Sequence, residues 1–141
     1  MPGPHVQVAT FCEKVLIEQD GVLSVIRAID RFILSGNVAA GAPAELPEGG
    51  ILQTTLLIVL RAGDAQGRHP VVIRPQQPSG VYLPDQPFDA TFGRDESGVN
   101  LILNMAVPII EGLYWFEVLV NETLLTRVPL RIMYQRVPGS P

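Results

Sequence analysis

Carboxylates gather in one stretch of this 141-residue sequence, DQPFDATFGRDES. They are Asp85, Asp89, Asp95 and Glu96. Calcium takes about six to eight oxygen ligands in flexible geometry, so an acidic loop at one end of a domain is one way to hold it. The spacing fits no EF-hand, however, and Asp beside Gly or Pro is also ordinary turn chemistry. A site for calcium or a carbohydrate in the 75–98 loop is therefore the alternative hypothesis.

The other residues that could do chemistry are few and scattered. The two histidines are His5, near the N-terminus, and His69, before Pro70. Neither has a Cys or His at zinc-ligand spacing, and the local motifs of nucleophilic catalysis, phosphate binding and dinucleotide binding are absent from the sequence. The single cysteine, Cys12, lies in an apolar run and is expected to be a buried thiol. We expect no enzyme, no metal and no cofactor.

Charge and composition narrow the classes of molecule that this chain could bind. Ten basic residues face fourteen acidic ones, for a net charge of −4, and the basic residues are scattered singly, which argues against nucleic acid. No apolar run approaches the ~18 residues of a membrane span, and the N-terminus lacks the cationic start of a secretory signal. Apolar residues make up 47% of the chain and charged residues only 17%, which leaves apolar surface for a partner. We expect a cytoplasmic protein that binds another copy or another protein, and no membrane.

Short β-branched runs separated by turns recur along the whole chain. We expect strands near 6–17, 22–34, 52–61, 70–74, 99–107, 113–120 and 124–134, and a short edge segment around 81–83. Helical periodicity never extends beyond two turns. The pattern predicts one all-β domain over residues 1–141, an antiparallel β-sandwich of about seven to eight strands with an immunoglobulin-like or related topology. The ends, 1–5 and 135–141, are expected to be flexible tails.

The stretch 111–132 reads as a β-hairpin with large apolar side chains on both faces of its first strand. A three-residue loop, 121–123, pairs Tyr114 with Leu130 and Phe116 with Val128 on a core face. The opposite, outer face then pairs Trp115 with Pro129, Glu117 with Arg127 and Leu119 with Leu125. Either a loop of the same chain, 35–50 or 75–98, covers this outer face, or it is an interface, where Trp and Arg are enriched.

Two further residues are given structural roles. Gly112-Leu113-Tyr114, entering a strand, resembles the tyrosine corner of immunoglobulin-like sandwiches, in which the phenol bonds backbone upstream. Asp30 lies within an apolar strand and is expected to pair with an arginine of a neighbouring strand, because an isolated buried charge is costly.

Three patterns of hydrophobic and turn residues span most of the chain. They are Phe-Cys-Glu at 11–13, Asp-Gly-Val-Leu-Ser-Val-Ile-Arg-Ala-Ile-Asp-Arg-Phe at 20–32 and Gly-Leu-Tyr-Trp-Phe-Glu-Val at 112–118. They resemble a family of small bacterial proteins of unknown function, whose members share an early aromatic-Cys pair, a Gly-x-Leu-x-(Val/Ile)-Ile strand leading to Asp-Arg and a late Gly-x-Tyr-x-Phe strand. The resemblance implies a bacterial β-sandwich. It supplies no activity and no site residues, and a fold alone does not give a function.

The sequence thus predicts a non-enzymatic interaction or structural module. It would associate with itself or with a partner through the outer face of its C-terminal hairpin, the six residues Trp115, Glu117, Leu119, Leu125, Arg127 and Pro129. The alternative, from another functional class, is the ligand-binding sandwich that uses the 75–98 loop.

Overall fold

The computed structural model describes residues 3–47, 49–94 and 98–138, and this part of the chain contains nine β-strands. The strands are β1 (His5–Ile17), β2 (Leu23–Ile29), β3 (Arg31–Asn37), β4 (Ile51–Arg61), β5 (Gly67–Gln76), β6 (Gln86–Phe92), β7 (Gly98–Pro108), β8 (Gly112–Val120) and β9 (Thr123–Val137). One short 3₁₀ turn, η1 (Val38–Ala40), follows β3. No helix of the described chain is long and apolar enough to cross a membrane.

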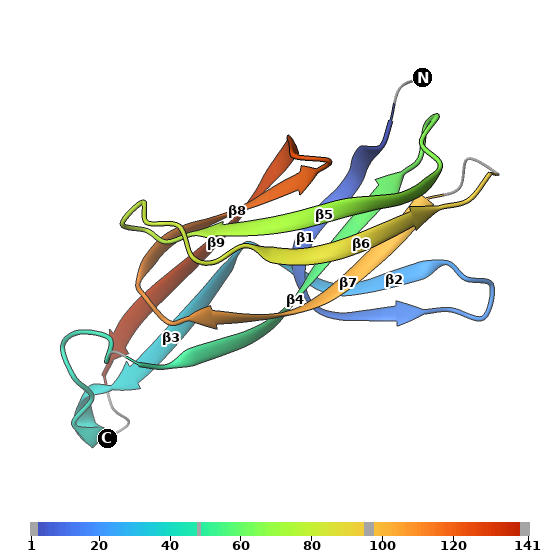
Figure 1. Cartoon of the computed structure of the whole chain (residues 1–141). Helices are drawn as coiled ribbons and strands as arrows, with labels where there is room; N and C mark the ends of the chain where they lie inside the picture. The colour runs from blue at the N-terminus through green and yellow to red at the C-terminus, as the bar shows by residue number, and fades with distance from the viewer. Residues whose placement is uncertain (1–2, 48, 95–97, 139–141) are drawn as a thin grey trace.

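The strands form two sheets packed face to face (Figure 1). One sheet has four strands in the order β2-β1-β4-β7, and the other has five in the order β3-β9-β8-β5-β6. The predicted β-sandwich is confirmed, with one exception to its antiparallel pairing: β3 and β9 run parallel. This exception arises because β3 leaves the sheet of β2 and joins the other sheet at its edge, beside the last strand of the chain.

The core lies between the two sheets. Its largest fully buried side chains include Phe11, Leu56, Ile58, Leu60, Met105, Ile73, Tyr114, Phe116, Leu130 and Ile132. Phe11 of β1 meets Phe116 of β8 edge to face, with ring centroids 4.8 Å apart, a contact worth about 0.5–1.5 kcal/mol beyond the area it buries. Because side chains alternate along a strand, an inward Phe116 turns the residues on either side of it outward. The position of Phe116 in the core therefore determines which side chains of β8 lie on its outer face.

The strand prediction was wrong in three places. The run 22–34 is two strands, since β2 ends at Ile29, β3 begins at Arg31, and Asp30 lies at the corner between the sheets. β6 lies within the 75–98 segment, for which the sequence predicts a connection. The prediction missed this strand because its inward residues alternate with Pro87 and Asp89, which weaken the strand signal. Around 81–83 there is one isolated bridge instead of an edge segment.

Tyr114 confirms the predicted tyrosine corner. Its hydroxyl donates a 2.7 Å hydrogen bond to the carbonyl oxygen of Pro108, six residues upstream. The side chain is fully buried, and burial raises the pKa of its phenol above 10.0. The bond fixes the turn that leads from β7 in one sheet to β8 in the other.

Both ends of the chain contribute strand residues. β1 begins at His5, and β9 continues to Val137, where its last residues pair with β3. Parts of both segments expected to be tails are therefore in strands. The outermost residues, 1–2 and 139–141, lie outside the described residues.

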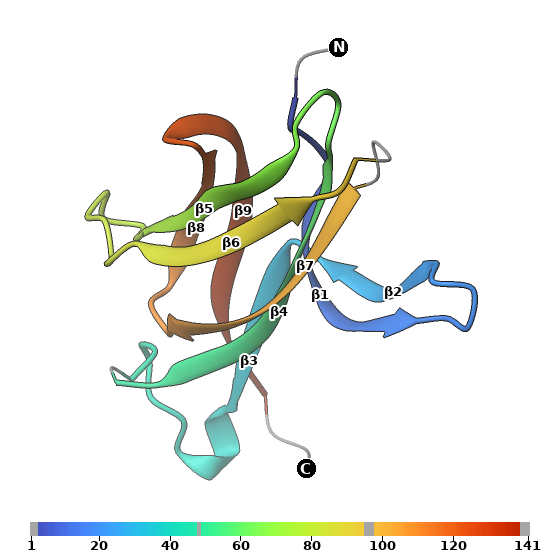
Figure 2. The ribbon, with the colours of Figure 1, turned by 45° about the vertical axis from the view of Figure 1, so that its right-hand side comes forward.

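The hairpin of β1 and β2 reaches beyond the sandwich (Figure 2). β1 pairs with β4 only as far as Cys12, opposite Thr55, whereas it pairs with β2 out to Ile17, opposite Leu23. We call residues 14–26 the hairpin arm. Its outer half is a two-stranded ribbon, and two-stranded ribbons alone are marginally stable in water.

Candidate interaction surface

The β8–β9 hairpin is closed by a two-residue turn. Val120 pairs with Thr123, and the two residues between them, Asn121 and Glu122, have positive φ angles of 51° and 67°. Two positive φ angles are the signature of a type I′ turn, whose twist matches that of the flanking strands. The predicted three-residue loop is therefore wrong.

A β-bulge reconciles this short turn with the rest of the predicted register. Leu119 pairs with Leu124 but Val118 pairs with Thr126, so Leu125 is an extra residue on β9. The predicted pairing of Leu119 with Leu125 is lost for the same reason. Beyond the bulge the predicted pairs are confirmed: Glu117 with Arg127, Phe116 with Val128, Trp115 with Pro129 and Tyr114 with Leu130.

Glu117 lies at the centre of the outer face and is only 6% exposed. Its Oε2 accepts hydrogen bonds from Arg127 Nη2 at 3.0 Å and from the Tyr82 hydroxyl at 3.2 Å. Arg74 Nη1 lies 3.9 Å from Oε1. A buried carboxylate is costly unless it is paired and hydrogen-bonded. These three partners therefore hold Glu117 in one place and make the centre of the face rigid.

A loop of the same chain covers one side of this face. Tyr82 lies in the loop between β5 and β6, where it bridges to Gln76, and the Leu83 N–H donates a 2.9 Å hydrogen bond to the Pro75 carbonyl. The six predicted residues consequently divide into three groups. Glu117 and Leu119 are buried, Trp115 and Leu125 are half-buried, and Arg127 and Pro129 are exposed.

Four arginines lie on the outer face of the five-stranded sheet: Arg31, Arg74, Arg127 and Arg131. Arg31 and Arg131 are register partners on neighbouring strands, so their side chains leave the sheet side by side. Ile33 and Met133, exposed register partners further along these strands, lie on the same face. We call this surface the arginine face; it consists of the four arginines, Ile33, Met133, Pro129 and Trp115.

Three of these arginines have a carboxylate partner and one does not. Asp30 pairs with Arg31 at 3.0 Å, Asp85 with Arg74 at 2.9 Å and Glu117 with Arg127 at 3.0 Å. None of the ion pairs found among the described residues includes Arg131. The arginine face therefore has one surplus positive charge, in a chain whose net charge is −4.

Comparison with known protein families assigns this chain to one of them. Residues 7–133 match a family of unknown function, DUF6941. The chain belongs to DUF6941. The match runs from β1 into β9 and confirms the resemblance to an uncharacterised family. A comparison of this DUF6941 chain with the curated proteins found no match.

Two carboxylates of the acidic segment, Asp85 and Asp89, are paired with arginines. Asp85 accepts hydrogen bonds on both oxygens from Arg74, at 2.9 and 3.2 Å, and Asp89 pairs with Arg68 at 2.8 Å. The predicted ligand residues Asp95 and Glu96 lie outside the described residues. Within the described ranges, no group of three or more His, Cys, Asp or Glu side chains could hold a metal ion. Asp85 and Asp89 thus link β5 to β6 and to the residue just before it.

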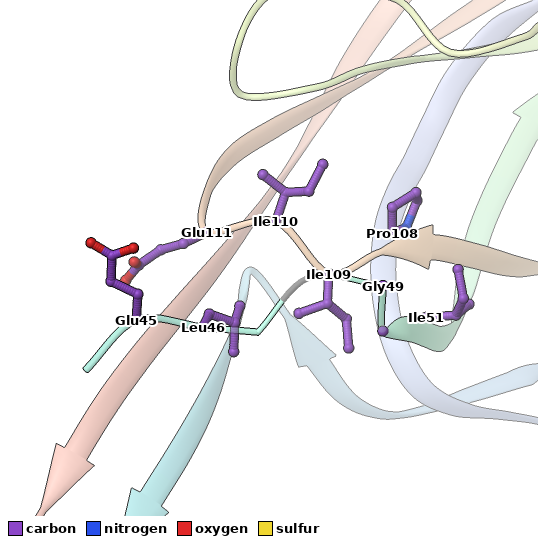
Figure 3. Close-up of a pocket in the computed structure, with 9 residues that line it drawn as sticks. Glu45, Leu46, Gly49, Ile51, Pro108, Ile109, Ile110 and Glu111 are labelled. Atoms are coloured by element: carbon purple, nitrogen blue, oxygen red, sulfur yellow. The ribbon is translucent and has the colours of Figure 1, made fainter. Parts of the chain in front are cut away.

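A cavity of about 620 Å³ lies where residues 45–46 and 49–50 meet the turn between β7 and β8 (Figure 3). Leu46, Ile109 and Ile110 give it an apolar wall, and two carboxylates, Glu45 and Glu111, lie at one end. Glu111 accepts a 3.1 Å hydrogen bond from the Tyr134 N–H, which ties this turn to β9. The described residues that line the cavity include no histidine, cysteine, serine or lysine, so the two carboxylates are the ionisable groups among them.

His69 has both ring nitrogens engaged within this DUF6941 chain. Asn121 Nδ2 donates to His69 Nδ1 at 2.7 Å, so Nε2 carries the proton that is donated to the Gln66 carbonyl at 3.0 Å. The ring also packs edge to face on Phe92. This histidine therefore holds the β8–β9 turn against the start of β5.

The contacts of Asp30 and Cys12 indicate structural roles for both residues. The expected ion pair of Asp30 with a neighbouring strand is wrong, because the residue lies at an exposed corner and bonds the adjacent Arg31. The hydrogen bond from Arg31 lowers the pKa of Asp30. Cys12 is buried as predicted, in a small cluster with Leu57 and Val59 on the outer side of the four-stranded sheet, and burial raises the pKa of its thiol.

Sequence reasoning missed two features of this chain. Tyr82 was not recognised as the partner of Glu117, since nothing local signals a contact across 35 residues. The sequence predicts ordinary strands where the hairpin arm lies. Its signal was available in adjacent apolar pairs, Leu16-Ile17 and Val25-Ile26, which place apolar side chains on both faces of a ribbon.

Proposed function

We propose that this chain is a non-enzymatic interaction module of the bacterial cytoplasm, which binds an acidic segment of another protein on the arginine face. The observation that supports this most directly is Arg131, which has no ion-pair partner within the described residues and lies beside Arg31. Guanidinium groups present planar forks that bind carboxylates through two hydrogen bonds. The engagement of both His69 nitrogens within the fold also favours binding over catalysis.

The apolar residues of the arginine face contribute the rest of the affinity. Exposed ion pairs are worth only about 0–1 kcal/mol each, so arginines alone would bind weakly. Trp115, Pro129 and Met133 offer an aromatic and aliphatic surface next to Arg127 and Arg131, the combination found at interface hot spots. Glu117, held by three partners, keeps this surface in one arrangement before binding, which lowers the entropy cost.

A second copy of the same face is a poor occupant. In a symmetric contact the same patch lies on both sides, so arginines would face arginines. Like charges placed opposite each other at an interface cost several kcal/mol. A partner with carboxylates removes this repulsion and pairs with the surplus charge at Arg131.

The experiment is a fluorescence-polarisation titration, in which the protein is added to a fluorescently labelled short peptide of alternating glutamate and valine. A labelled peptide of alternating lysine and valine is the control. We expect the acidic peptide to bind, and to bind less well as ionic strength rises. Arg131→Glu should weaken binding at least about tenfold, or ~1.4 kcal/mol. Arg94→Glu, a reversal at an exposed arginine outside the arginine face, should leave it unchanged. Equal binding of both peptides, or an unchanged affinity in Arg131→Glu, would contradict the proposal.

A further inference from the structure

We infer that the hairpin arm joins two copies of this chain into a symmetric dimer, by antiparallel pairing of β2 with β2. This surface is separate from the arginine face, which stays open to another partner. The inference rests on the exposure of the arm, the chemistry of its free edge and the charges at its two ends.

The arm exposes large apolar side chains on both of its faces. They are Leu16, Ile17, Val22, Val25 and Ile26, and Ile17 and Val22 are 68% and 60% exposed. Ile17 and Val25 belong to the face whose other residues, Val15 and Leu23, pack against the sandwich, whereas Leu16 and Ile26 belong to the opposite face. Concentrated apolar exposure of this kind marks an interaction site.

The free edge of the arm is suited to pairing with another strand. β2 is at the edge of its sheet, and its segment from 22 to 26, Val-Leu-Ser-Val-Ile, has no charge and no proline. Edge strands that avoid association carry charges, prolines or bulges. β6, an edge of the other sheet, follows that rule with Pro87 and Asp89. β2 lacks such protection until Arg27, whose φ of 52° interrupts the extended backbone.

The segment is also complementary to itself. With Ser24 on a two-fold axis, Val22 lies opposite Ile26 and Leu23 lies opposite Val25, so no like charges meet along the pair. Edge pairing would join the two four-stranded sheets into one continuous sheet. The uncharged side chains of one edge would then lie beside those of the other, a match that a charged partner would not offer.

The two ends of the arm carry opposite charges where this pairing brings them together. The tip holds Glu18 and Asp20, and Arg27, the residue directly after the arm, lines a groove of about 470 Å³ at its base. In the antiparallel arrangement the acidic tip of one copy lies next to Arg27 of the other. Arg27 already contacts Glu13 at 3.3 Å, but its side chain is 77% exposed and has donors left for a second carboxylate. This match favours a second copy over other occupants.

Light scattering coupled to size-exclusion chromatography tests the dimer. The full chain should have twice the 15.3 kDa mass of one copy at submillimolar concentration. Ile26→Lys, which puts a charge on the edge, should return the mass to one copy, whereas Val81→Lys, at an exposed apolar residue of another loop, should not. Arg131→Glu should leave the mass unchanged, which separates this inference from the proposed function. A wild type with the mass of one copy, or a folded Ile26→Lys that remains a dimer, would overturn it.

A conservative variant covers the case in which Ile26→Lys does not fold. Ser24→Cys places two thiols across the proposed axis, where paired strands bring Cβ atoms within disulfide reach. Mild oxidation should give a disulfide-linked dimer on a non-reducing gel. The wild type, whose only thiol is the buried Cys12, and Ser79→Cys in the exposed loop after β5 should give none. A Ser24→Cys protein that crosslinks no better than Ser79→Cys would count against the arm.

Discussion

The Tyr82 hydroxyl donates a 3.2 Å hydrogen bond to Glu117 Oε2, and this contact closes one side of the outer face of β8. Glu117 is also held from β9, by Arg127. The loop after β5 and the β8–β9 hairpin therefore share one buried carboxylate. The open part of the surface is left on the side of β9 and β3, where the arginine face lies.

The first prediction concerns this contact. Tyr82→Phe removes one hydrogen bond to a charged group and should lower the free energy of unfolding by about 1.5 kcal/mol. Because the loop is then held less firmly, the amide of Leu83, which bonds the Pro75 carbonyl, should exchange faster with deuterium. Urea unfolding and hydrogen exchange measure both. Ser79→Ala, in the same loop, is the control, and equal effects of the two changes would refute a specific role for Tyr82.

The second prediction concerns acid stability. The hydrogen bond from Arg74 lowers the pKa of Asp85 from its usual 3.8. A carboxyl whose pKa is lower in the folded state stabilises the fold above its unfolded pKa of about 4, and this stabilisation disappears as the pH falls through the folded pKa. Asp85→Asn should therefore reduce stability near neutral pH and make less difference at about pH 3. Thermal unfolding at both pH values tests this, and an equal loss at both would be inconsistent with the pair.

The third prediction concerns the hairpin turn. Glu122 adopts a φ of 67°, a conformation that costs a residue with a side chain roughly 1–2 kcal/mol. Glu122→Gly removes this cost and should stabilise the protein by about 0.5–1 kcal/mol after the greater flexibility of glycine in the unfolded chain is counted. The melting temperature should rise by about 1–4 °C. Glu122→Ala keeps the Cβ and should give no gain; a gain as large as that of glycine would argue against the type I′ turn.

The fourth prediction concerns Tyr114 at alkaline pH. Burial raises the pKa of its phenol, so the unfolded chain releases this proton first and stability falls as the pH rises past about 10. Tyr114→Phe should cost about 1–3 kcal/mol at neutral pH, because the hydrogen bond to the Pro108 carbonyl is lost. The decline above about pH 10 should be shallower in this variant. A parallel alkaline decline in both proteins would show that other groups cause it.

Local patterns predicted the sandwich and most of the hairpin, and tertiary contacts account for what they missed. The pairing of Glu117 with Arg127 followed from alternation, since opposite charges and a tryptophan-proline contact agreed on one register. The bulge at Leu125 could not be inferred, because a three-residue loop and a two-residue turn with one extra residue give the same register for every pair beyond it. The same holds for Tyr82, whose role depends on the path of a proline-rich loop.

Asp30 shows a second limit of the sequence. In an apolar run it read as a buried charge, but the chain turns from one sheet to the other at this residue and exposes it. The exposure of the hairpin arm could not be predicted for the same reason. Its strand pattern was recognised, yet the point at which β1 leaves β4, at Cys12, depends on the whole sheet. Burial, which decides both cases, is set by packing between strands distant in sequence.

The emission of Trp115 tests the central claim most directly. This residue is the only tryptophan of the chain and is half-buried on the arginine face, so its fluorescence reports binding at that surface. Adding the peptide of alternating glutamate and valine should shift or quench the emission to saturation, and Arg131→Glu should move the midpoint at least about tenfold higher. An emission that stays constant while the labelled peptide binds would place the acidic partner elsewhere and contradict the account.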